Sequence, residues 1–239
     1  MTKSLKILVL YPEEMNIYGD HGNLLTLQKR AEKRGLTTET VLYEPDMKFD
    51  ERADIILGGG GQDSGQSKIQ DDLAEIAPKL RKLAASGTPM LVICGLYQLF
   101  GRYFETATGE KINGIGIFDA YTVAGPKRLI GNIVTKSAEF GELVGYENHS
   151  GLTFLGQNQK PLARVKKGAG NDASGKFEGA RTGNVFGSYL HGPILPKNPR
   201  LADEIIRLAA VKKYPDFKLS QIDDSLAEKA RAIAKKRPR

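Results

Sequence analysis

Short aliphatic runs alternate with longer amphipathic stretches over roughly the first hundred residues of this chain, and that alternation restricts its fold more than any other feature. Apolar residues recur at helical spacing in Asn23–Arg34, where Asn23 is the expected cap and Gly35 the stop, and in Asp71–Ser86. Strands and helices that alternate along a chain build βαβ units, so we expect an α/β fold with a mostly parallel sheet flanked by helices. Strands are predicted at Leu5–Leu10, Thr37–Tyr43, Asp54–Leu57 and Pro89–Ile93.

The pattern changes from about residue 112, where short apolar runs are separated by glycine and polar turns. These runs predict short, mainly antiparallel strands, followed by a turn-rich excursion over residues 166–184, the strand Val185–Leu190 and the helix Pro199–Val211. We expect one domain over residues 1–215 and a basic, loosely packed helical tail over residues 216–239. The short strands are predicted at Thr122–Val123, Leu129–Val134 and Leu152–Leu155.

Charge and composition exclude several classes of protein. The formal charge is +7, but residues 227–239 carry six cations against Glu228 alone, so the rest of the chain is nearly neutral. A basic terminus without a recognition motif is usually solvated, and we therefore expect no nucleic-acid binding. No apolar run approaches the roughly 18 residues needed to span a bilayer, and the N-terminus lacks a signal-peptide cleavage site. We therefore expect a cytoplasmic protein.

Cys94 is the single cysteine, so neither an internal disulfide nor a cysteine-based zinc cluster can form. It follows an apolar strand and precedes a predicted helix, which is the strand-to-helix turn of a nucleophile elbow. Parallel sheets bind their ligands at this carboxyl edge, and a helix N-terminus favours a thiolate. We predict that Cys94 is a nucleophile; the alternative is a free cysteine that only packs in the core.

A thiolate nucleophile needs a proton carrier, and the chain has three histidines, His21, His149 and His191. His191 directly follows the predicted strand Val185–Leu190 and precedes the turn at Gly192, so it is expected at the same sheet edge as the cysteine. We assign the proton transfer to it. His21 suits a polar loop, and for His149 a structural and a functional role are equally open.

Four consecutive glycines, Gly58–Gly61, close the third predicted strand. Glycine allows backbone N–H groups to turn toward an anion, and the amide of Gly95, next to the cysteine, offers another donor. We predict that Gly59, Gly60 and Gly95 contact the substrate and stabilise its oxyanion.

A second glycine-rich run, Gly170–Lys176, has the glycine and lysine spacing of a P-loop. Phe177 replaces the Ser or Thr that would hold magnesium, and no helical pattern follows. We therefore expect no ATP site, no metal site and no cofactor in this chain.

Three ordered segments resemble the glutamine amidotransferases of the cobyric acid synthase type, the CobB/CobQ-like class I amidotransferases. Cys94–Gly101 is similar to their C-G-x-Y-Q-x-x-G pattern, Gly145–Gly151 to G-Y-E-x-H, and Ser188–Gly192 to their histidine strand. The resemblance implies a three-layer, flavodoxin-like fold and a glutaminase that works through a cysteine thioester. It also implies a substrate-binding role for Gln98.

The chain departs from the family pattern in two places. Many class I amidotransferases carry a Glu two residues after the histidine, but Pro193 stands there in this chain, so the group that orients His191 is left unassigned. Small residues usually flank the nucleophile at two positions that are here Val92 and Leu96. We expect a looser elbow turn for that reason.

Glutamine selectivity requires a cation for the α-carboxylate of the substrate, and the planar fork of an arginine matches a carboxylate. We choose Arg128 over Arg102 and Arg181, because it lies in a glycine- and proline-bracketed segment of the antiparallel half.

The short length and the segments at residues 18–23 and 58–63 resemble most closely the amidotransferase subunits of lipid II isoglutaminyl synthases. That resemblance implies a Mur-ligase-like partner subunit (MurT type), with ATP and Mg on the partner. The partner would use the ammonia to convert the D-glutamate of lipid II to D-isoglutamine. Because lipid II is held at the inner face of the plasma membrane, the resemblance also implies a location near that face, which the basic tail would aid electrostatically.

Three alternatives stay open from the sequence. The acceptor could be a corrin-type carboxylate, as in cobyrinic or cobyric acid. The chain could instead be a cysteine hydrolase or peptidase on a related α/β fold. It could also be a catalytically silent binding subunit in which Cys94 only packs.

Overall fold

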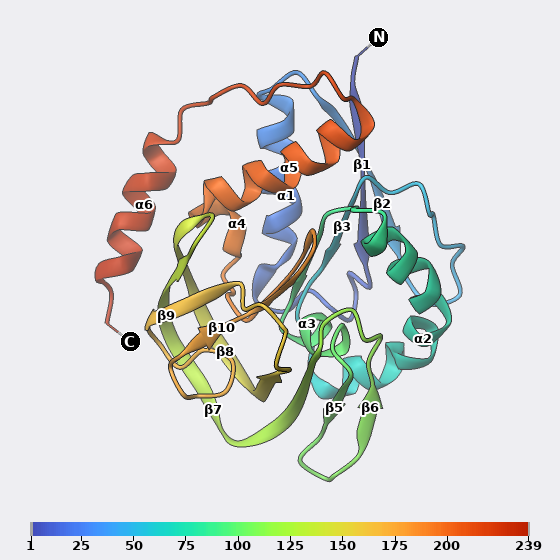
Figure 1. Ribbon diagram of the computed structural model, residues 1–239, viewed down its shortest axis with the longest axis vertical. Coiled ribbons are helices and arrows are strands. Elements are labelled where there is room, and N and C mark those ends of the chain that lie inside the picture. Colours follow the sequence, from blue (N-terminus) through green and yellow to red (C-terminus); the bar gives the residue numbers. More distant parts are fainter. Residues whose placement is uncertain (1, 239) are drawn as a thin grey trace.

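The computed structural model describes residues 2–238, so Met1 and the terminal cation Arg239 lie outside the described part (Figure 1). In chain order the elements are β1 (Ser4–Leu10), the 3-10 turn η1 (Ile17–Gly19), α1 (His21–Glu32), β2 (Thr37–Tyr43), β3 (Ile55–Gly58), α2 (Asp63–Ala85), β4 (Met90–Ile93), α3 (Gly95–Leu99), β5 (Tyr103–Glu105), β6 (Lys111–Asn113), β7 (Ala120–Ser137), β8 (Gly141–Leu155), β9 (Ala163–Lys167), β10 (Phe177–Glu178), β11 (Ala180–Thr182), β12 (Val185–Ser188), α4 (Ile194–Lys197), α5 (Pro199–Lys213) and α6 (Ser225–Lys236).

The first sheet has the strand order β11-β12-β4-β3-β1-β2, and every strand except β11 runs parallel. Strands β3, β4 and β12 are buried along their whole length, which is why the sequence shows them as continuous apolar runs. Helices α1 and α5 cover one face of this sheet, and α2 and α3 lie on the other (Figure 1). The prediction of a three-layer α/β fold with a mostly parallel sheet is confirmed.

Two helix starts differ from the prediction. Helix α1 begins at His21 with Asp20 as its cap, so Asn23 lies inside the first turn, where its Oδ1 accepts the Leu195 amide at 3.0 Å. Helix α2 begins at Asp63 rather than Asp71, because its first two turns are mostly polar and give no apolar periodicity to detect.

The second sheet is mainly antiparallel, as predicted, but two of its strands are much longer than expected. Strands β7 and β8, of 18 and 15 residues, form one long hairpin. Gly125 and Pro126, which read as a turn, instead occupy an irregularity in the β7–β8 register between Ala124 and Leu129. The turn-rich excursion contains the short strands β10 and β11.

The C-terminal region packs on the domain at two places. Arg30 of α1 is almost buried and makes a bidentate pair with Asp203 of α5, at 2.7 and 2.8 Å, and a second pair with Asp224 just before α6, at 2.6 Å. Helix α6 lies beside the β7–β8 hairpin and α4 (Figure 1). The division of the chain at residues 215 and 216 stays a prediction.

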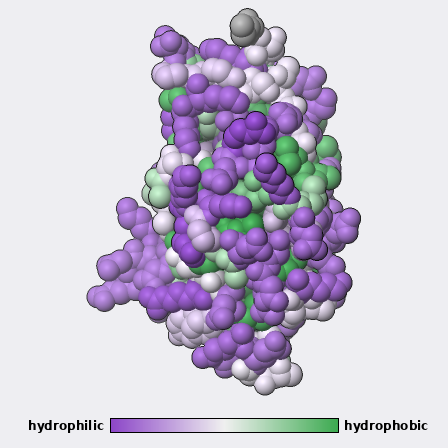
Figure 2. All heavy atoms as spheres, turned by 90° about the vertical axis from the view of Figure 1, so that its right-hand side faces the viewer, coloured by the Kyte–Doolittle hydropathy of each residue, from purple (hydrophilic) through white to green (hydrophobic). Residues whose placement is uncertain are grey.

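The outer face of α2 is mostly hydrophilic, with scattered hydrophobic residues between the polar ones (Figure 2). This agrees with the alternation of buried and exposed positions along that helix. Among residues 2–238, no helix combines the length and the apolar character needed to cross a bilayer.

Replacing Arg30 by Ala is expected to lower the free energy of unfolding by about 1.5–3 kcal/mol, because Asp224 would lose this cation and Asp203 would be left with Arg34. Urea unfolding curves measure this difference. The neighbouring Lys29 is exposed and pairs with Glu32 at the surface, so Lys29→Ala should change the free energy of unfolding by less than about 0.5 kcal/mol. Equal effects of the two substitutions would show that the pairs of Arg30 with Asp203 and Asp224 do not stabilise the fold.

Candidate active site

Cys94 stands between the end of β4 and the start of α3, and its backbone is held in the left-handed region. Its φ is 48° and its ψ −104°, a conformation that costs a residue other than glycine about 1–3 kcal/mol. The Cys94 amide donates to the Ser188 carbonyl at 2.9 Å, and its carbonyl accepts the Gln98 amide at 2.9 Å. This is the strained strand-to-helix turn of a nucleophile elbow.

The looser turn expected from Val92 and Leu96 is not observed, because glycines on the neighbouring strands make room. A Cβ on Gly58 of β3 would lie 2.4 Å from Leu96 Cδ1 and 3.4 Å from Val92 Cγ1. A Cβ on Gly187 of β12 would lie 2.2 Å from Cδ2 of Tyr97. Small residues on the flanking strands therefore replace small residues beside the cysteine.

His191 follows β12 and lies beside Cys94 over the glycine loop, with no solvent exposure. A Cβ on Gly60 would lie 2.8 Å from His191 Cε1 and 3.0 Å from Cys94 Cβ, so both side chains share the space that glycine leaves open. An antiparallel bridge to Tyr146 of β8 holds the histidine backbone, with N–O distances of 2.8 and 3.2 Å. The structure thus brings together the two predicted catalytic residues.

Asp20 is the group that orients the histidine. Its Oδ1 lies 3.4 Å from His191 Nδ1, and its Oδ2 accepts the Gly60 amide at 2.8 Å. Burial lowers the pKa of His191, but Asp20 and Cys94 outweigh it and raise the pKa to about 10. Because Nδ1 faces Asp20, Nε2 is the ring nitrogen left for the Cys94 side chain.

Tyr18 covers the histidine from the solvent side. Its ring contacts the imidazole edge to face, with centroids 5.0 Å apart. Like Cys94, it has a positive φ, of 58°. Its hydroxyl accepts a 3.4 Å hydrogen bond from Arg128, which links the loop before α1 to the long hairpin.

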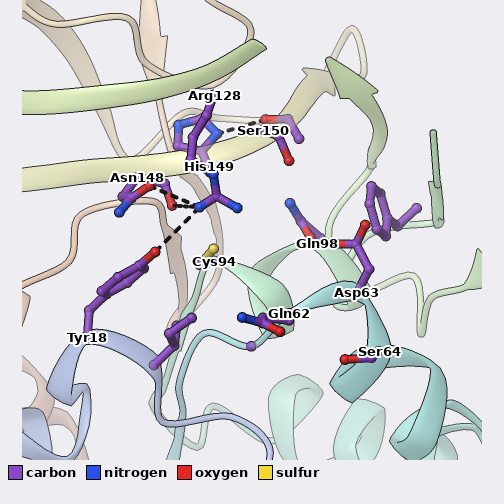
Figure 3. Close-up of a pocket in the computed structure, with 14 residues that line it drawn as sticks. Tyr18, Gln62, Asp63, Ser64, Cys94, Gln98, Arg128, Asn148, His149 and Ser150 are labelled. Carbon is purple, nitrogen blue, oxygen red and sulfur yellow. Dashed lines mark hydrogen bonds between the residues drawn. The ribbon is translucent and has the colours of Figure 1, made fainter. Parts of the chain in front are cut away.

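A pocket of about 320 Å³ opens above the cysteine (Figure 3). This volume lies within the range of small-molecule sites. The start of α2 forms one wall, and the β7–β8 hairpin forms the other with Arg128, Asn148 and His149. Arg128 lies at the bulge in β7, and its Nη1 donates to Asn148 Oδ1 at 2.9 Å, so its guanidinium is directed into the pocket.

Gln98 lines the same pocket, but its side chain is already bonded within the protein. Its Nε2 donates to the Tyr189 hydroxyl at 3.0 Å, and its Oε1 accepts Nε2 of Gln66 at 2.8 Å. Gln66 also donates to the Gly95 carbonyl at 2.9 Å. Gln98 and Gln66 therefore fix the first turn of α3, and with it the turn at the cysteine.

The glycine loop contributes Gly61, rather than Gly59 or Gly60, to the pocket wall. The Gly60 amide is taken by Asp20, and Gly59 lies against the Met15 carbonyl, 2.1 Å from where its Cβ would stand. The Gly61 nitrogen lies 3.0 Å from the Cβ position of Gly95. The two amides nearest the elbow on this side are thus those of Gly61 and Gly95.

His149 borders the pocket but is buried beneath it. Its ring stacks on Tyr189 at 3.6 Å, and its Nδ1 bonds to the Gly151 carbonyl at 2.7 Å. Burial, with the charges of His191 and Arg128, outweighs the bond to Gly151 and lowers the pKa of His149 to about 4. The imidazole of His149 is therefore neutral and packed against its neighbours. His21 is exposed at the start of α1 and its ring has no contact with the pocket above the cysteine.

The other arginine candidates lie elsewhere. Arg102 pairs with Asp119 and Arg181 with Glu139, and both line a separate groove. In the P-loop-like run, the Gly170 amide donates to a buried carboxylate of β8 rather than facing solvent. Within the described residues, no three His, Cys, Asp or Glu side chains are grouped to hold a metal ion.

Asp20 and Gln66 were missed from the sequence. The polar segment around residue 20 contains His21, which was considered as a proton carrier. The residue that contacts His191 is its neighbour Asp20. Gln66 lies in the polar first turns of α2, and nothing local marks it as buried.

A strained cysteine paired with an imidazole and an aspartate at the edge of a parallel sheet defines a cysteine-dependent amidohydrolase-type site. Residues 6–199 match the CobB/CobQ-like glutamine amidotransferase domain, and the chain belongs to that family.

Two relatives share nearly the whole chain. The lipid II isoglutaminyl synthase (glutamine-hydrolyzing) subunit GatD of Streptococcus pneumoniae is 42% identical over 230 residues, which are 94% of this chain and 88% of the relative. Its namesake from Staphylococcus aureus is 37% identical, over 96% of this chain and 94% of the relative. A probable cobyric acid synthase of Methanothermobacter thermautotrophicus is 33% identical over 58% of this chain but only 30% of its own length.

Solved structures agree on the fold. A glutamine amidotransferase crystal structure superposes with a TM-score of 0.59 at 17% identity, covering 86% of this chain and 99% of that one. A glutamine amidotransferase from Thermotoga maritima gives 0.52 at 14% identity, covering 97% and 93%.

Replacing Asp20 by Asn removes the charge that helps to hold the proton on His191. The pKa of His191 should fall below about 10, so the alkaline limb of the rate profile should move to lower pH. We expect kcat for ammonia release to fall about 100-fold or more, because the imidazole also loses its orienting partner. Steady-state rates across pH measure both effects. Asp71→Asn, on the exposed face of α2, is the control, and a profile unchanged in Asp20→Asn would refute the role of Asp20.

Proposed function

We propose that this chain hydrolyses L-glutamine and supplies the ammonia to an ATP-dependent partner subunit that amidates the D-glutamate of lipid II. The observation that carries the first part is the alignment of Cys94, His191 and Asp20 beside a pocket that also holds an arginine. The names of the two relatives that share nearly the whole chain support the second part.

The chemistry begins with a thiolate and an imidazolium. The Cys94 sulfur attacks the carboxamide carbon of glutamine, and His191 gives its proton to the departing nitrogen, which leaves as ammonia. The carbon–nitrogen bond breaks and a glutamyl thioester remains. A water molecule then attacks the thioester, His191 takes a proton from it, and glutamate leaves with the thiolate restored.

The amides of Gly61 and Gly95 are the donors proposed for the oxyanion. They lie next to each other beside the elbow, and Gly95 is in the first turn of α3, where N–H groups have no partner within the helix. One such donor contributes about 3–4 kcal/mol in comparable acyl-transfer sites. Asp20 supports them indirectly, because it holds the adjacent Gly60 amide in place.

Arg128 is the proposed partner of the substrate α-carboxylate. Arg128→Ala should raise KM for glutamine about 10- to 100-fold with a smaller change in kcat, since a charged hydrogen bond is lost in both the ground and the transition state. Arg102→Ala, which alters a separate groove, should leave KM unchanged. Steady-state kinetics of both variants test the assignment, which fails if the two behave alike.

Ammonia in bulk water becomes ammonium, which is not a nucleophile, so the glutaminase has to deliver it directly to an activated carboxyl. We place that activation on a Mur-ligase-like subunit that binds ATP and Mg, because the only P-loop-like run in this chain lacks the magnesium ligand. Since lipid II is a membrane-bound acceptor, we also place the complex at the inner face of the plasma membrane.

Ammonia release from L-glutamine by the wild type, Cys94→Ala and His191→Ala, with and without the partner subunit, tests the proposal. Either substitution should lower the rate about 1,000-fold or more. A glutamine-derived diazoketone should label Cys94, as seen by mass spectrometry. Full activity in Cys94→Ala would reject the nucleophile.

Reconstitution with the partner, ATP and lipid II tests the acceptor. Amidated stem peptide by mass spectrometry is the expected product. Amidation of a corrin carboxylate instead would reassign the acceptor and leave the glutaminase intact. Hydrolysis of peptides or esters without any response to glutamine would favour the cysteine hydrolase.

A further inference from the structure

Glu178 is a fully buried carboxyl that lies outside the pocket, on the short strand β10. Its Oε1 accepts the Tyr189 amide at 2.7 Å and the Ser188 hydroxyl at 3.0 Å. Its Oε2 has no hydrogen-bond partner among residues 2–238. A buried acidic group in such a place needs an explanation, because the proposed reaction makes no use of it.

The two groups that Glu178 holds connect it to both catalytic residues. The Ser188 carbonyl accepts the Cys94 amide at 2.9 Å, so the end of β12 is part of the elbow turn. The Ser188 hydroxyl also accepts the Leu190 amide at 3.0 Å, and the next residue is His191. Oε1 of Glu178 thus holds the backbone at residues 188–191 in place. This stretch binds the Cys94 amide and carries the His191 side chain.

We infer that Glu178 is a positioning residue for the catalytic pair: by bracing the end of β12, it sets the distance between the Cys94 sulfur and the His191 ring. The inference rests on the proposed glutaminase activity for one of its readouts. It does not place Glu178 in contact with substrate.

The charge state of Glu178 follows from its surroundings. Among the described residues, the titratable groups that face it are Glu147 of β8 and Tyr97 of α3, and neither is a cation. Burial, together with the charge of Glu147, outweighs the hydrogen bonds from Tyr189 and Ser188 and raises the pKa of Glu178 to about 8. Glu178 is therefore neutral at neutral pH, and its carbonyl oxygen accepts both donors.

Ionisation above that pH places a charge in the core beside an Oε2 that has no donor. Only movement of the carboxylate toward water or a new donor relieves this cost, and such movement displaces Ser188 and Tyr189. The catalytic pair should then lose its alignment as the pH rises through about 8. This alkaline limb of the pH–rate profile is distinct from the one that the pKa of His191, about 10, would set.

The test compares Glu178→Gln and Glu178→Ala with wild type over about pH 6 to 10, using ammonia release from glutamine. An amide oxygen still accepts both donors and cannot ionise, so Glu178→Gln should keep kcat near neutral pH within about two-fold and lose the limb near 8. Glu178→Ala should lower kcat about 10- to 100-fold with KM changed less than about two-fold. A role in stability alone would not remove the limb.

Two controls sharpen the comparison. Glu147→Gln removes a neighbouring carboxyl that raises the pKa of Glu178, so the limb should move to lower pH without disappearing. Glu110→Gln, at an exposed position, should leave the profile unchanged. A limb near 8 that persists in Glu178→Gln, or a wild-type kcat in folded Glu178→Ala, would overturn the inference.

Alkylation of Cys94 by iodoacetamide gives a readout that does not depend on glutamine. Glu178→Ala should react about ten-fold more slowly than wild type at neutral pH, because the thiolate loses its aligned imidazolium, whereas Glu178→Gln should react at the wild-type rate. If the wild type fails to hydrolyse glutamine but shows this difference, the proposed function fails and the positioning role stands. Equal alkylation rates in all three proteins would reject the positioning role.

Discussion

The backbone of Cys94 has to hold a positive φ, and the rest of the site is arranged around that one strained residue. Its amide is bound by β12, its carbonyl by α3, and its side chain meets the imidazole above Gly60. No single contact supplies the strain energy. It is balanced by the buried parallel strands on both sides, whose packing leaves the turn no room to relax.

The two sheets contribute different residues to the site. The parallel sheet supplies the proposed reacting groups, Cys94 and His191, at the carboxyl ends of β4 and β12, where open α/β folds bind their ligands. The antiparallel hairpin β7–β8 closes the other side and brings Arg128 over the cysteine through an irregularity in its register. Tyr18 joins the two halves through its bond to that arginine. The pocket above Cys94 therefore lies between the two sheets, and neither sheet alone forms it.

Local patterns predicted the parallel strands, the elbow and the histidine, because each of these depends on a few consecutive residues. Asp20 could not be assigned in this way, since it reaches His191 across 171 positions of sequence and only the packed sheet brings them together. The same holds for Gly61, which replaces Gly60 at the pocket because Asp20 occupies the Gly60 amide. The long strands were missed because a glycine and a proline mark a turn in sequence and a bulge in the folded hairpin.

Asp20 divides its two oxygens between a main-chain amide and a ring nitrogen. A carboxylate bound on both sides cannot rotate, so the imidazole is presented in one orientation before any ligand arrives. The reorganisation that a flexible acid would need in each turnover is instead completed once, during folding. The loop before α1 is far from Cys94 in sequence, but the site depends on the fixed position of this loop as much as on the cysteine.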